Sequence, residues 1–577
     1  MRFRELAEVF GRLQLISSRL GMVKVAADLF RRAGLEELEP IVYLLQGRLR
    51  PAYEGVELGV GERILVRVVA RAAEATEASV LTRYRKLGDL GLVAESLLKV
   101  PRGPPLSIRQ AYAGLLEVAR SGGAGAVERR IGLLVELLRR ASALEARFLV
   151  RVVQGRLRLG IGDATILEAA AAGGLGDRSR KSLIEQAYNV RSDLGGIVRL
   201  AFAQGARGLA RVRPQVGVPV RPALAQRLAS AEAIVARLGM VRAEPKYDGF
   251  RLQMHRDGDK VWAFSRRLED VSAMFPDLAA GLRRQLRVRR AILEGEAVVY
   301  DPATGRFLPF QITMTRKRKH RIAEAAKRHP LRLFAFDLLF ANGRNYLGKP
   351  QAERSRRLAA LLRNPGRGVV RPTESLLARN AGELQRYFDA MIRRGLEGVV
   401  AKRLDAPYRA GTRGYDWVKL KRSYQSKLRD TVDVVLVGYL AGRGKRAALG
   451  VGSLLGAVYD PRRDRFRTVA KIGSGLSERE WLALRRRMDR LACSSRPRRV
   501  DSTIRPDVWI EPKLVAEVLA DEITRSPTHT CGKSGRAPGF ALRFPRMLGL
   551  RADRVAEDAT TEREITQMYG MQGRRSA

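Results

Sequence analysis

Apolar residues change their spacing along the chain, and these changes mark out different regions. Up to about residue 213 they recur every three or four positions, as at 131–139 and 144–153, which predicts a run of helices. Residues 211–222 are rich in proline and have no helical period, so we expect a connecting segment there. Between that segment and residue 422, strand patterns alternate with shorter helical patterns.

The C-terminal region has short, β-branched strand patterns bounded by glycine. These patterns lie at residues 432–440, 453–459, 466–472 and 509–518, with a helical pattern at 478–491. Such an order is typical of a small β-barrel such as an OB-fold. Residues 560–569 are predicted to be helical, and residues 570–577 are predicted to be frayed.

We therefore expect a multidomain fold. A chain of 577 residues is long enough for about three or four domains of ordinary size. The expected parts are an all-α N-terminal domain at residues 1–213, an α+β domain at 214–422, and a β-barrel OB-fold domain with a C-terminal helix at 423–577.

The chain is strongly basic, with 108 lysines and arginines against 60 acidic residues and a formal net charge of +48. Such an excess favours a polyanionic partner, and nucleic acid fits best. Part of the excess can instead reflect genome composition, because arginine greatly outnumbers lysine. The hydrophobic content of 45% is that of a globular protein rather than a disordered one.

The N-terminus has no long apolar core and no cleavage site of small residues, so we do not expect a signal peptide. No segment has the ~18 uninterrupted apolar residues that a membrane span requires, and we expect a soluble, intracellular protein. Cys493 and Cys531 are too few for a four-thiolate zinc site. They are either small buried residues or one disulfide.

The most informative motif is Lys246-Tyr-Asp-Gly249, which follows Glu244-Pro245. A lysine amine must lose its proton before it can attack a phosphate, and burial and nearby cations favour that loss. Arg251 can supply part of the positive field. The alternative is a surface turn, because Asp-Gly is a common turn dipeptide.

Three acidic residues of the middle region are candidates for binding. Glu294 and Glu296 share one face of a predicted strand at 292–301. Two neighbouring carboxylates repel, so we expect a divalent metal, a ribose hydroxyl or a basic partner beside them; the alternative is a solvated strand face. Glu397, on a short apolar strand pattern at 396–402, suits Mg²⁺, which takes oxygen ligands and only one or two protein carboxylates.

Two further strand patterns carry basic and aromatic residues. Lys419 and Lys421 lie on the same strand face as Trp417, where they form either a phosphate clamp or a basic surface. Phe334 and Phe336 also share a face. Such aromatic residues are usually part of a core, but one of them can instead be a platform on which a purine stacks.

In their order along the chain, these motifs resemble those of the covalent nucleotidyltransferases, which include the polynucleotide ligases and the mRNA capping enzymes. The matching stretches are 246–249, 265–270, 294–296, 336–337, 397–402, 417–421 and 541–546. Two N-terminal stretches, at 81–95 and 157–166, look like the helical DNA-binding domain of archaeal and eukaryotic replicative DNA ligases. Residues 218–222 are similar to that family's entry into its adenylation domain.

The resemblance covers nearly the whole chain. It implies a helical DNA-binding domain, an adenylation domain and an OB domain that close round nicked duplex DNA and seal it through a lysine–AMP intermediate. A capping enzyme or an RNA ligase would lack the helical domain. An NAD-dependent ligase would carry a four-cysteine zinc module. A non-catalytic DNA-binding protein would explain the charge but not the ordered motifs.

The resemblance also implies a role for each matching residue. Lys246 is similar to the nucleophile that takes AMP, while Glu244 and Phe336 match positions that hold adenine by hydrogen bonding and by stacking. Arg251 and Glu296 match positions at the ribose. The other implied roles are nucleotide and phosphate contacts for Arg266, Arg413 and Lys419, a second clamp lysine at Lys421, a mobile OB-domain arginine at Arg543, and metal-associated carboxylates at Glu296 and Glu397.

The implied nucleotide is ATP, with ADP or GTP as alternatives, and the implied metal is Mg²⁺, with Mn²⁺ as an alternative. Nicked double-stranded DNA is the expected partner of a monomer that acts in the cytoplasm on the nucleoid and not at a membrane. A sliding clamp is a further candidate partner, although the sequence has no clear clamp-binding box.

Overall fold

The computed structural model describes the chain apart from residues 156, 158, 302–306, 309–311, 314, 317, 319, 365, 367, 422–430, 443–448, 536 and 575–577, with the backbone alone for 571–574. The described residues form two compact units. The first contains Met1–Arg227, Ile234–Tyr387 and Val399–Lys419, and the second contains Leu228–Ala233, Phe388–Gly398 and Leu420–Ala577. The boundary expected at 213/214 falls inside the first unit and the one at 422/423 falls outside the described residues, so the division into three domains stays a prediction.

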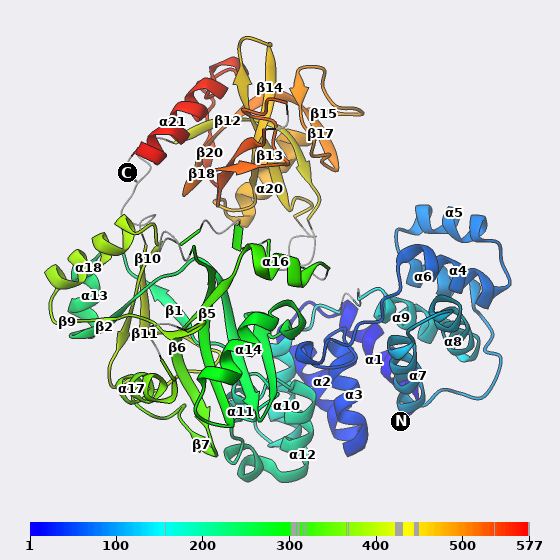
Figure 1. Cartoon of the computed structure of the whole chain (residues 1–577). Helices are drawn as coiled ribbons and strands as arrows, with labels where there is room; N and C mark the ends of the chain where they lie inside the picture. Colours follow the sequence, from blue (N-terminus) through cyan, green and yellow to red (C-terminus); the bar gives the residue numbers. More distant parts are fainter. Residues whose placement is uncertain are drawn as a thin grey trace. The chain divides into compact units, whose positions relative to one another are not determined.

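The N-terminal part of the first unit is helical, as its apolar spacing predicts (Figure 1). Its helices are α1 (Phe3–Leu15), α2 (Arg19–Arg32), α3 (Leu35–Leu45), α4 (Glu62–Ala73), α5 (Glu77–Leu87), α6 (Leu90–Leu97), α7 (Ile108–Arg120), α8 (Ala126–Arg140), α9 (Ala143–Val153), α10 (Asp163–Gly174), α11 (Lys181–Val190) and α12 (Leu194–Ala210). Their apolar faces share one core, in which the rings of Phe10 and Phe148 meet edge to face at 5.3 Å.

One motif of this region has a clear structural role. Asp89 caps α6 through the backbone N–H groups of Gly91 and Leu92. The same carboxylate is ion-paired with Arg151 of α9, Nη2 to Oδ2 at 2.7 Å, with both side chains buried. Asp89 therefore starts one helix and joins it to another, which orients the two helices on a common core.

The central part contains two sheets. The six-stranded sheet has the order β4-β3-β5-β6-β7 with β8 beside β6, and the five-stranded sheet has the order β1-β11-β10-β2-β9. The strands are β1 (Leu224–Arg227), β2 (Val241–Pro245), β3 (Phe250–Asp257), β4 (Lys260–Ser265), β5 (Arg290–Val299), β6 (Leu331–Ala341), β7 (Arg344–Asn345), β8 (Val370–Pro372), β9 (Leu376–Ala378), β10 (Gly398–Arg403) and β11 (Arg413–Lys421). The helices are α13 (Ala231–Leu238), α14 (Pro276–Gln285), α16 (Ile322–Arg328), α17 (Gln351–Leu361) and α18 (Ala381–Arg393).

The two faces of β5 belong to different cores. Leu293, Ala297 and Val299 pack in one cluster with apolar residues of α14 and α17, as the period of two predicts. On the other face, Ile292 packs with Trp417 of β11 in a second cluster. The face that carries Glu294 and Glu296 therefore looks towards the five-stranded sheet.

The second unit is rich in β-structure. Its large sheet has the order β15-β17-β12-β13-β14-β16 with β20 beside β17, and β18 and β19 form a separate pair. The strands are β12 (Val432–Leu440), β13 (Ser453–Asp460), β14 (Arg465–Ile472), β15 (Ala492–Cys493), β16 (Val500–Asp501), β17 (Val508–Leu519), β18 (Glu522–Ser526), β19 (Gly539–Arg543) and β20 (Arg546–Leu550). This half-barrel fits the OB-fold that the strand spacing predicts. The helices are α20 (Glu478–Asp489) and α21 (Glu562–Arg574).

The C-terminal helix is longer than predicted. We expected fraying from residue 570, but α21 continues to Arg574. Glu562 in its first turn is ion-paired with Arg467, Nη1 to Oε2 at 2.6 Å, and the ring of Tyr569 lies 4.8 Å from that of Phe540. These contacts hold the helix from its first turn as far as Tyr569.

The two cysteines are not joined. Cys493 and Cys531 are both free thiols, and Cys531 is buried. This decides against the disulfide and, for Cys531, in favour of a small buried residue. None of the described helices combines the length and the apolar composition that crossing a lipid bilayer requires.

Candidate active site

Lys246 lies in the short connection between β2 and β3 and is partly buried. The glycine of its motif is required by packing, because a Cβ atom on Gly249 would lie 2.3 Å from the carbonyl oxygen of Ala297. Tyr247 is buried, and its ring stacks on that of Phe334 at 4.4 Å. A surface turn would not bury its aromatic residue in this way, so the connection is a fixed part of the sheet's edge.

Of the two carboxylates on β5, Glu296 is the one that interacts electrostatically with Lys246. It lies opposite Arg251 in the pairing of β3 with β5 and accepts a hydrogen bond from the Gly249 N–H. Burial raises the pKa of the Glu296 carboxyl to about 7, while the charges of Lys246 and Arg251 oppose the rise. The structure therefore gathers a lysine, an arginine and a carboxylate around one backbone connection.

Glu294 has a different role from its neighbour. Its Oε2 accepts hydrogen bonds from Arg251 Nη2 at 2.8 Å and from the Tyr408 hydroxyl at 2.7 Å. The side chain of Glu294 is only 1% exposed, so the alternative of a solvated strand face is wrong for this residue. The basic partner expected beside the two carboxylates is Arg251.

Phe336 is displaced from the regular pairing of β6. Asp337 pairs with Glu294 and Ala335 pairs with Gly295, so Phe336 is the extra residue of a β-bulge. Its half-buried ring lies 5.9 Å from the ring of Trp417, edge to face, and 4.7 Å from Lys402 Nζ. Phe334 is buried against Tyr247, so only Phe336 of the two has a ring surface that suits stacking.

Glu244 and Lys402 form a buried ion pair between β2 and β10. Lys402 Nζ lies 2.6 Å from Glu244 Oε2 and also donates to the carbonyl oxygen of Phe336 at 3.1 Å. The other carboxylate oxygen, Glu244 Oε1, is buried without a hydrogen-bond partner. Burial raises the pKa of the Glu244 carboxyl, and Lys402 opposes that rise. A buried acceptor without a partner indicates a place for a donor from a ligand.

Sequence reasoning gave Lys402 no role, although it stands at the end of an otherwise apolar strand pattern. We expect Lys402→Met to lower the free energy of unfolding by about 3 kcal/mol, because it leaves a buried carboxylate unpaired. The double variant Lys402→Met/Glu244→Gln should recover most of that loss, because no buried charge remains. Denaturant titration of the three proteins at pH 7.5 checks this. Equal losses in the single and double variants would mean that packing of the lysine stem, and not charge, causes the effect.

The strand that carries Lys419 and Lys421 alternates as predicted. Val418 and Leu420 of β11 are fully buried, whereas Lys419 and Lys421 are partly exposed. Arg413 is exposed at the start of the same strand. Arg266 is exposed in the turn that follows β4.

Glu397 lies one residue before β10 rather than within it. It is ion-paired with Lys421. Gly398 has φ +144, and a Cβ atom there would lie 2.1 Å from the carbonyl oxygen of Leu420, so only glycine allows this approach of the two strands. The approach brings the carboxylate of Glu397 to the end of β11.

The described residues contain no group of three or more histidines, cysteines or acids that could hold a metal ion on its own. Mg²⁺ needs only one or two protein carboxylates when phosphates and water supply the other ligands. Carboxylate oxygens at Glu296 and Glu397 are the ligand type that Mg²⁺ prefers. Each carboxylate by itself therefore suits a metal that arrives with a phosphate ligand, and not a site closed by protein alone.

Arg543 belongs to the second unit, at the end of β19. It pairs with Glu522 on β18, Nη1 to Oε1 at 2.5 Å, and its guanidinium lies 4.9 Å from the ring centroid of Phe544. Phe544 is 59% exposed. Its φ of +51 lies in the left-handed region, which residues other than glycine rarely adopt.

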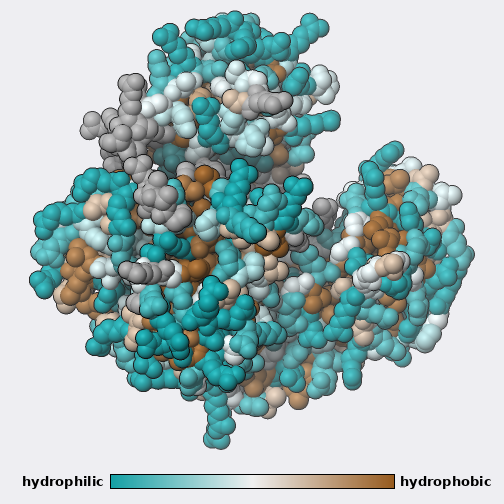
Figure 2. All heavy atoms as spheres, viewed as in Figure 1, coloured by the Kyte–Doolittle hydropathy of each residue, from teal (hydrophilic) through white to brown (hydrophobic). Residues whose placement is uncertain are grey.

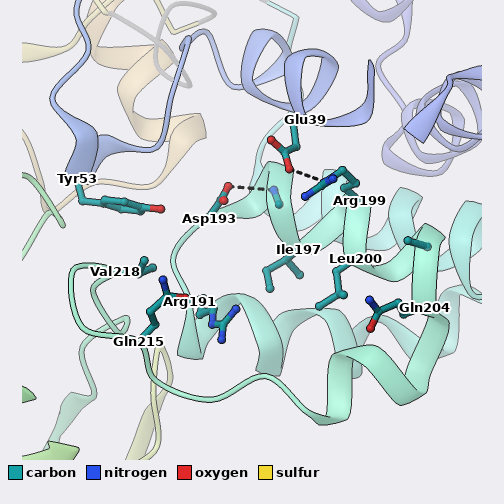
Figure 3. A pocket seen from close by; sticks show the side chains of 12 residues that line it. Glu39, Tyr53, Arg191, Asp193, Ile197, Arg199, Leu200, Gln204, Gln215 and Val218 are labelled. Carbon is teal, nitrogen blue, oxygen red and sulfur yellow. Dashed lines mark hydrogen bonds and ion pairs between the residues drawn. The ribbon is translucent and has the colours of Figure 1, made fainter. Parts of the chain in front are cut away.

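A cavity of about 440 Å³ lies elsewhere in the first unit (Figure 3). It is lined by side chains that include Tyr53, Arg191 and Asp193, and none of the candidate site residues lines it. This cavity is therefore not the place where the candidate chemistry gathers.

Known proteins resemble this chain over nearly its whole length. It is 43% identical over 572 residues to the probable DNA ligase of Dictyoglomus turgidum, covering 99% of this chain and 97% of the relative. It is 42% identical over 594 residues to the DNA ligase of Staphylothermus marinus, covering 99% of both. The chain belongs to the ATP-dependent DNA ligase family.

Three family models match the ligase in chain order. They are the DNA ligase N terminus at residues 2–171, the ATP dependent DNA ligase domain at 222–421 and the ATP dependent DNA ligase C terminal region at 447–554. The solved structure described as "Pmar-Lig_Pre." is 16% identical and covers 95% of this chain and 99% of its own, with a TM-score of 0.54. The predicted fold class, with a helical N-terminal region, a mixed adenylation domain and a C-terminal β-rich domain, is confirmed.

Family membership also confirms the predicted activity. The protein is an ATP-dependent DNA ligase, and DNA is its substrate. The RNA-capping and non-catalytic alternatives are thereby excluded.

Proposed function

We propose that this ligase carries AMP on Lys246. The observation that supports this most directly is the meeting of Lys246, Arg251 and Glu296 around the Gly249 connection, beside which Glu244 presents a buried acceptor. In the first step the Nζ of Lys246 attacks the α-phosphorus of ATP, a P–N bond forms, and pyrophosphate leaves. The lysine proton passes to solvent.

The two later steps move AMP to the DNA and then release it. The 5′-phosphate of a nick attacks the α-phosphorus, which breaks the P–N bond and returns the electron pair to Lys246. The 3′-hydroxyl then attacks the 5′-phosphorus, and AMP leaves. Each step displaces a charged group at phosphorus, so the protein acts by positioning and by neutralising charge.

The surrounding residues are assigned to the parts of the nucleotide. Glu244 and Phe336 hold adenine, and Arg251 and Glu296 contact the ribose. Arg266, Arg413, Lys419 and Lys421 contact the nucleotide and its phosphates, and Arg543 contacts the leaving pyrophosphate. Mg²⁺, or Mn²⁺ in its place, would be held by Glu296 and Glu397 and would neutralise charge on the transferring phosphate.

Glu244 also supports a nucleotide preference. A buried carboxylate oxygen without a partner accepts a hydrogen bond from the exocyclic amine of adenine, whereas guanine has a carbonyl oxygen at that position. Two facing acceptors leave both unpaired, which costs ~1–3 kcal/mol, or about 5- to 150-fold in affinity. We therefore infer that ATP or ADP is used in preference to GTP.

Incubation of the protein with α-labelled ATP, ADP, GTP or NAD, followed by denaturing electrophoresis, tests this function. We expect a covalent band with ATP and none with NAD, and loss of the band when nicked duplex is added. A GTP band as strong as the ATP band would contradict the role given to Glu244. No band with any nucleotide would contradict the lysine–AMP intermediate.

The remaining assignments concern partners and organisation. The net charge of +48 and the mainly hydrophilic face shown in Figure 2 support contact with the DNA backbone. We propose domains at 1–213, 214–422 and 423–577, a monomer in solution, and a site of action in the cytoplasm on the nucleoid. A sliding clamp is the proposed protein partner, to be tested by co-elution with the purified ligase.

A further inference from the structure

The connecting segment at residues 217–223 is held by side chains of β3. The Gly217 N–H donates to His255 Nδ1 at 3.0 Å. Gln253 binds both backbone polar groups of one residue: its Oε1 accepts from the Val220 N–H at 2.7 Å, and its Nε2 donates to the Val220 carbonyl at 2.9 Å. The segment has no helix or strand of its own, so these bonds replace a regular ladder.

In the hydrogen bonds of His255 and Gln253, the donor and the acceptor can be assigned from the neighbouring bonds. Burial lowers the pKa of the fully buried His255 to about 3, so its ring is neutral. Because Nδ1 accepts from Gly217, the proton of the neutral ring lies on Nε2, which donates to Gln253 Oε1 at 2.9 Å. The amide nitrogen of Gln253 must then face the Val220 carbonyl and Glu294 Oε1, the latter at 3.3 Å.

The same network reaches Arg251. Glu294 receives hydrogen bonds from Gln253 on one oxygen and from Arg251 and Tyr408 on the other. Arg251 Nη1 donates to the Ala223 carbonyl at 2.7 Å, and the Ala223 N–H donates to the Tyr408 hydroxyl at 2.9 Å. The connecting segment is thus bonded to this network at two places, to Gln253 at Val220 and to Arg251 and Tyr408 at Ala223.

On its other side the segment is tied to the helical part. The Arg221 N–H donates to the carbonyl of Asn189 at 2.9 Å, and the Ser192 hydroxyl donates to the Pro219 carbonyl at 2.8 Å. Close to these bonds, Val218 lines the cavity shown in Figure 3, so its packing there is incomplete. Hydrogen bonds therefore fix the segment together with the packing of Val220 and Ala223, which are buried in one hydrophobic cluster.

We propose that Gln253 is a positioning residue that holds Glu294 and Arg251 in place and ties them to residues 217–223. The end of the helical part and the nucleotide site then share one polar network, and the segment is not a loose linker. The inference rests on the proposed role of Arg251 at the ribose and adds a residue that does not touch the nucleotide.

The substitution Gln253→Glu tests the proposal with almost no change in shape. The introduced carboxylate still accepts from His255 and Val220, but its second oxygen faces the Val220 carbonyl and the carboxylate of Glu294. Arg251 and Tyr408, which also face this group, already bond to Glu294. Two adjacent carboxylates favour protonation of one of them, and a protonated acid again supplies one donor. Gln204→Glu, the same change at an exposed position of α12, is the control.

The measurement is the KM for ATP and the rate of self-adenylation in the full-length protein between pH 5.5 and 9, as a ratio of variant to wild type. At pH 8.5 we expect the KM of Gln253→Glu to rise about tenfold or more with a smaller change in rate. The ratio should return towards one as pH falls, and Gln204→Glu should match wild type throughout.

Each other outcome has a distinct meaning. A ratio near one at every pH would overturn the proposal. A KM ratio that is raised equally at every pH, together with a lowered melting temperature, would show a structural role alone and would overturn it as well. Wild-type protein that forms no adenylate at all would instead contradict the proposed function, so the two failures are distinguishable.

Discussion

Replacing Lys246 by alanine is expected to abolish the covalent adenylate. Its Nζ is the only atom to which we assign the attack on the α-phosphorus of ATP, so no slower route to a covalent adenylate remains in this site. Lys246→Arg should be equally inactive, because a guanidinium stays protonated and is a poor nucleophile. Labelling with α-labelled ATP checks both variants, with detection down to about one part in ten thousand of the wild-type rate, because removal of a nucleophile can cost about a millionfold.

Two controls separate chemistry from folding. Lys260→Ala removes an exposed lysine of β4, whose ammonium lies 4.6 Å from the ring of Trp262, and it should label like wild type. Lys246→Ala should still seal a nick that already carries 5′-AMP, because that step forms no bond to lysine. A labelled band in Lys246→Ala would place the nucleophile elsewhere, and loss of sealing on the pre-adenylated nick would indicate a damaged site.

The parts of the site that follow a strand period could be predicted from the sequence. The alternation of polar and apolar residues predicts that Glu294 and Glu296 share one face of β5. It predicts the same for Lys419 and Lys421 on β11, and the structure agrees in both cases. A period of two survives folding because one face of each strand must be buried.

Other parts of the site depend on contacts between distant segments. The bulge at Phe336 arises from the register of β6 against β5, which no local pattern reports. The pairing of Lys402 with Glu244 joins strands far apart in sequence. The bonds of Gln253 to Val220 likewise turn a proline-rich stretch, which looks like a free linker, into a fixed segment. The roles given to the individual site residues remain predictions.

Arg543 is the other residue for which we expect a large effect. If its guanidinium neutralises the leaving pyrophosphate, Arg543 acts in the first step. Once AMP is on the lysine, the pyrophosphate has left and this role has ended. Arg543→Ala should then slow self-adenylation by about a hundredfold or more, as for loss of a charge that acts in the transition state. Sealing of a nick that already carries 5′-AMP should stay close to the wild-type rate in single-turnover assays.

The partner of Arg543 provides the matched control. Arg543 is ion-paired with Glu522 across the β18–β19 hairpin, and such partly exposed pairs contribute little to stability, about 0–1 kcal/mol. If Arg543 served only to hold the hairpin, Glu522→Gln and Arg543→Ala would have similar effects. If it acts on pyrophosphate, Glu522→Gln should leave self-adenylation unchanged or make it faster, because it removes a competing carboxylate. Equal defects in both variants, or a defect of Arg543→Ala in sealing the pre-adenylated nick, would contradict the assignment to the first step.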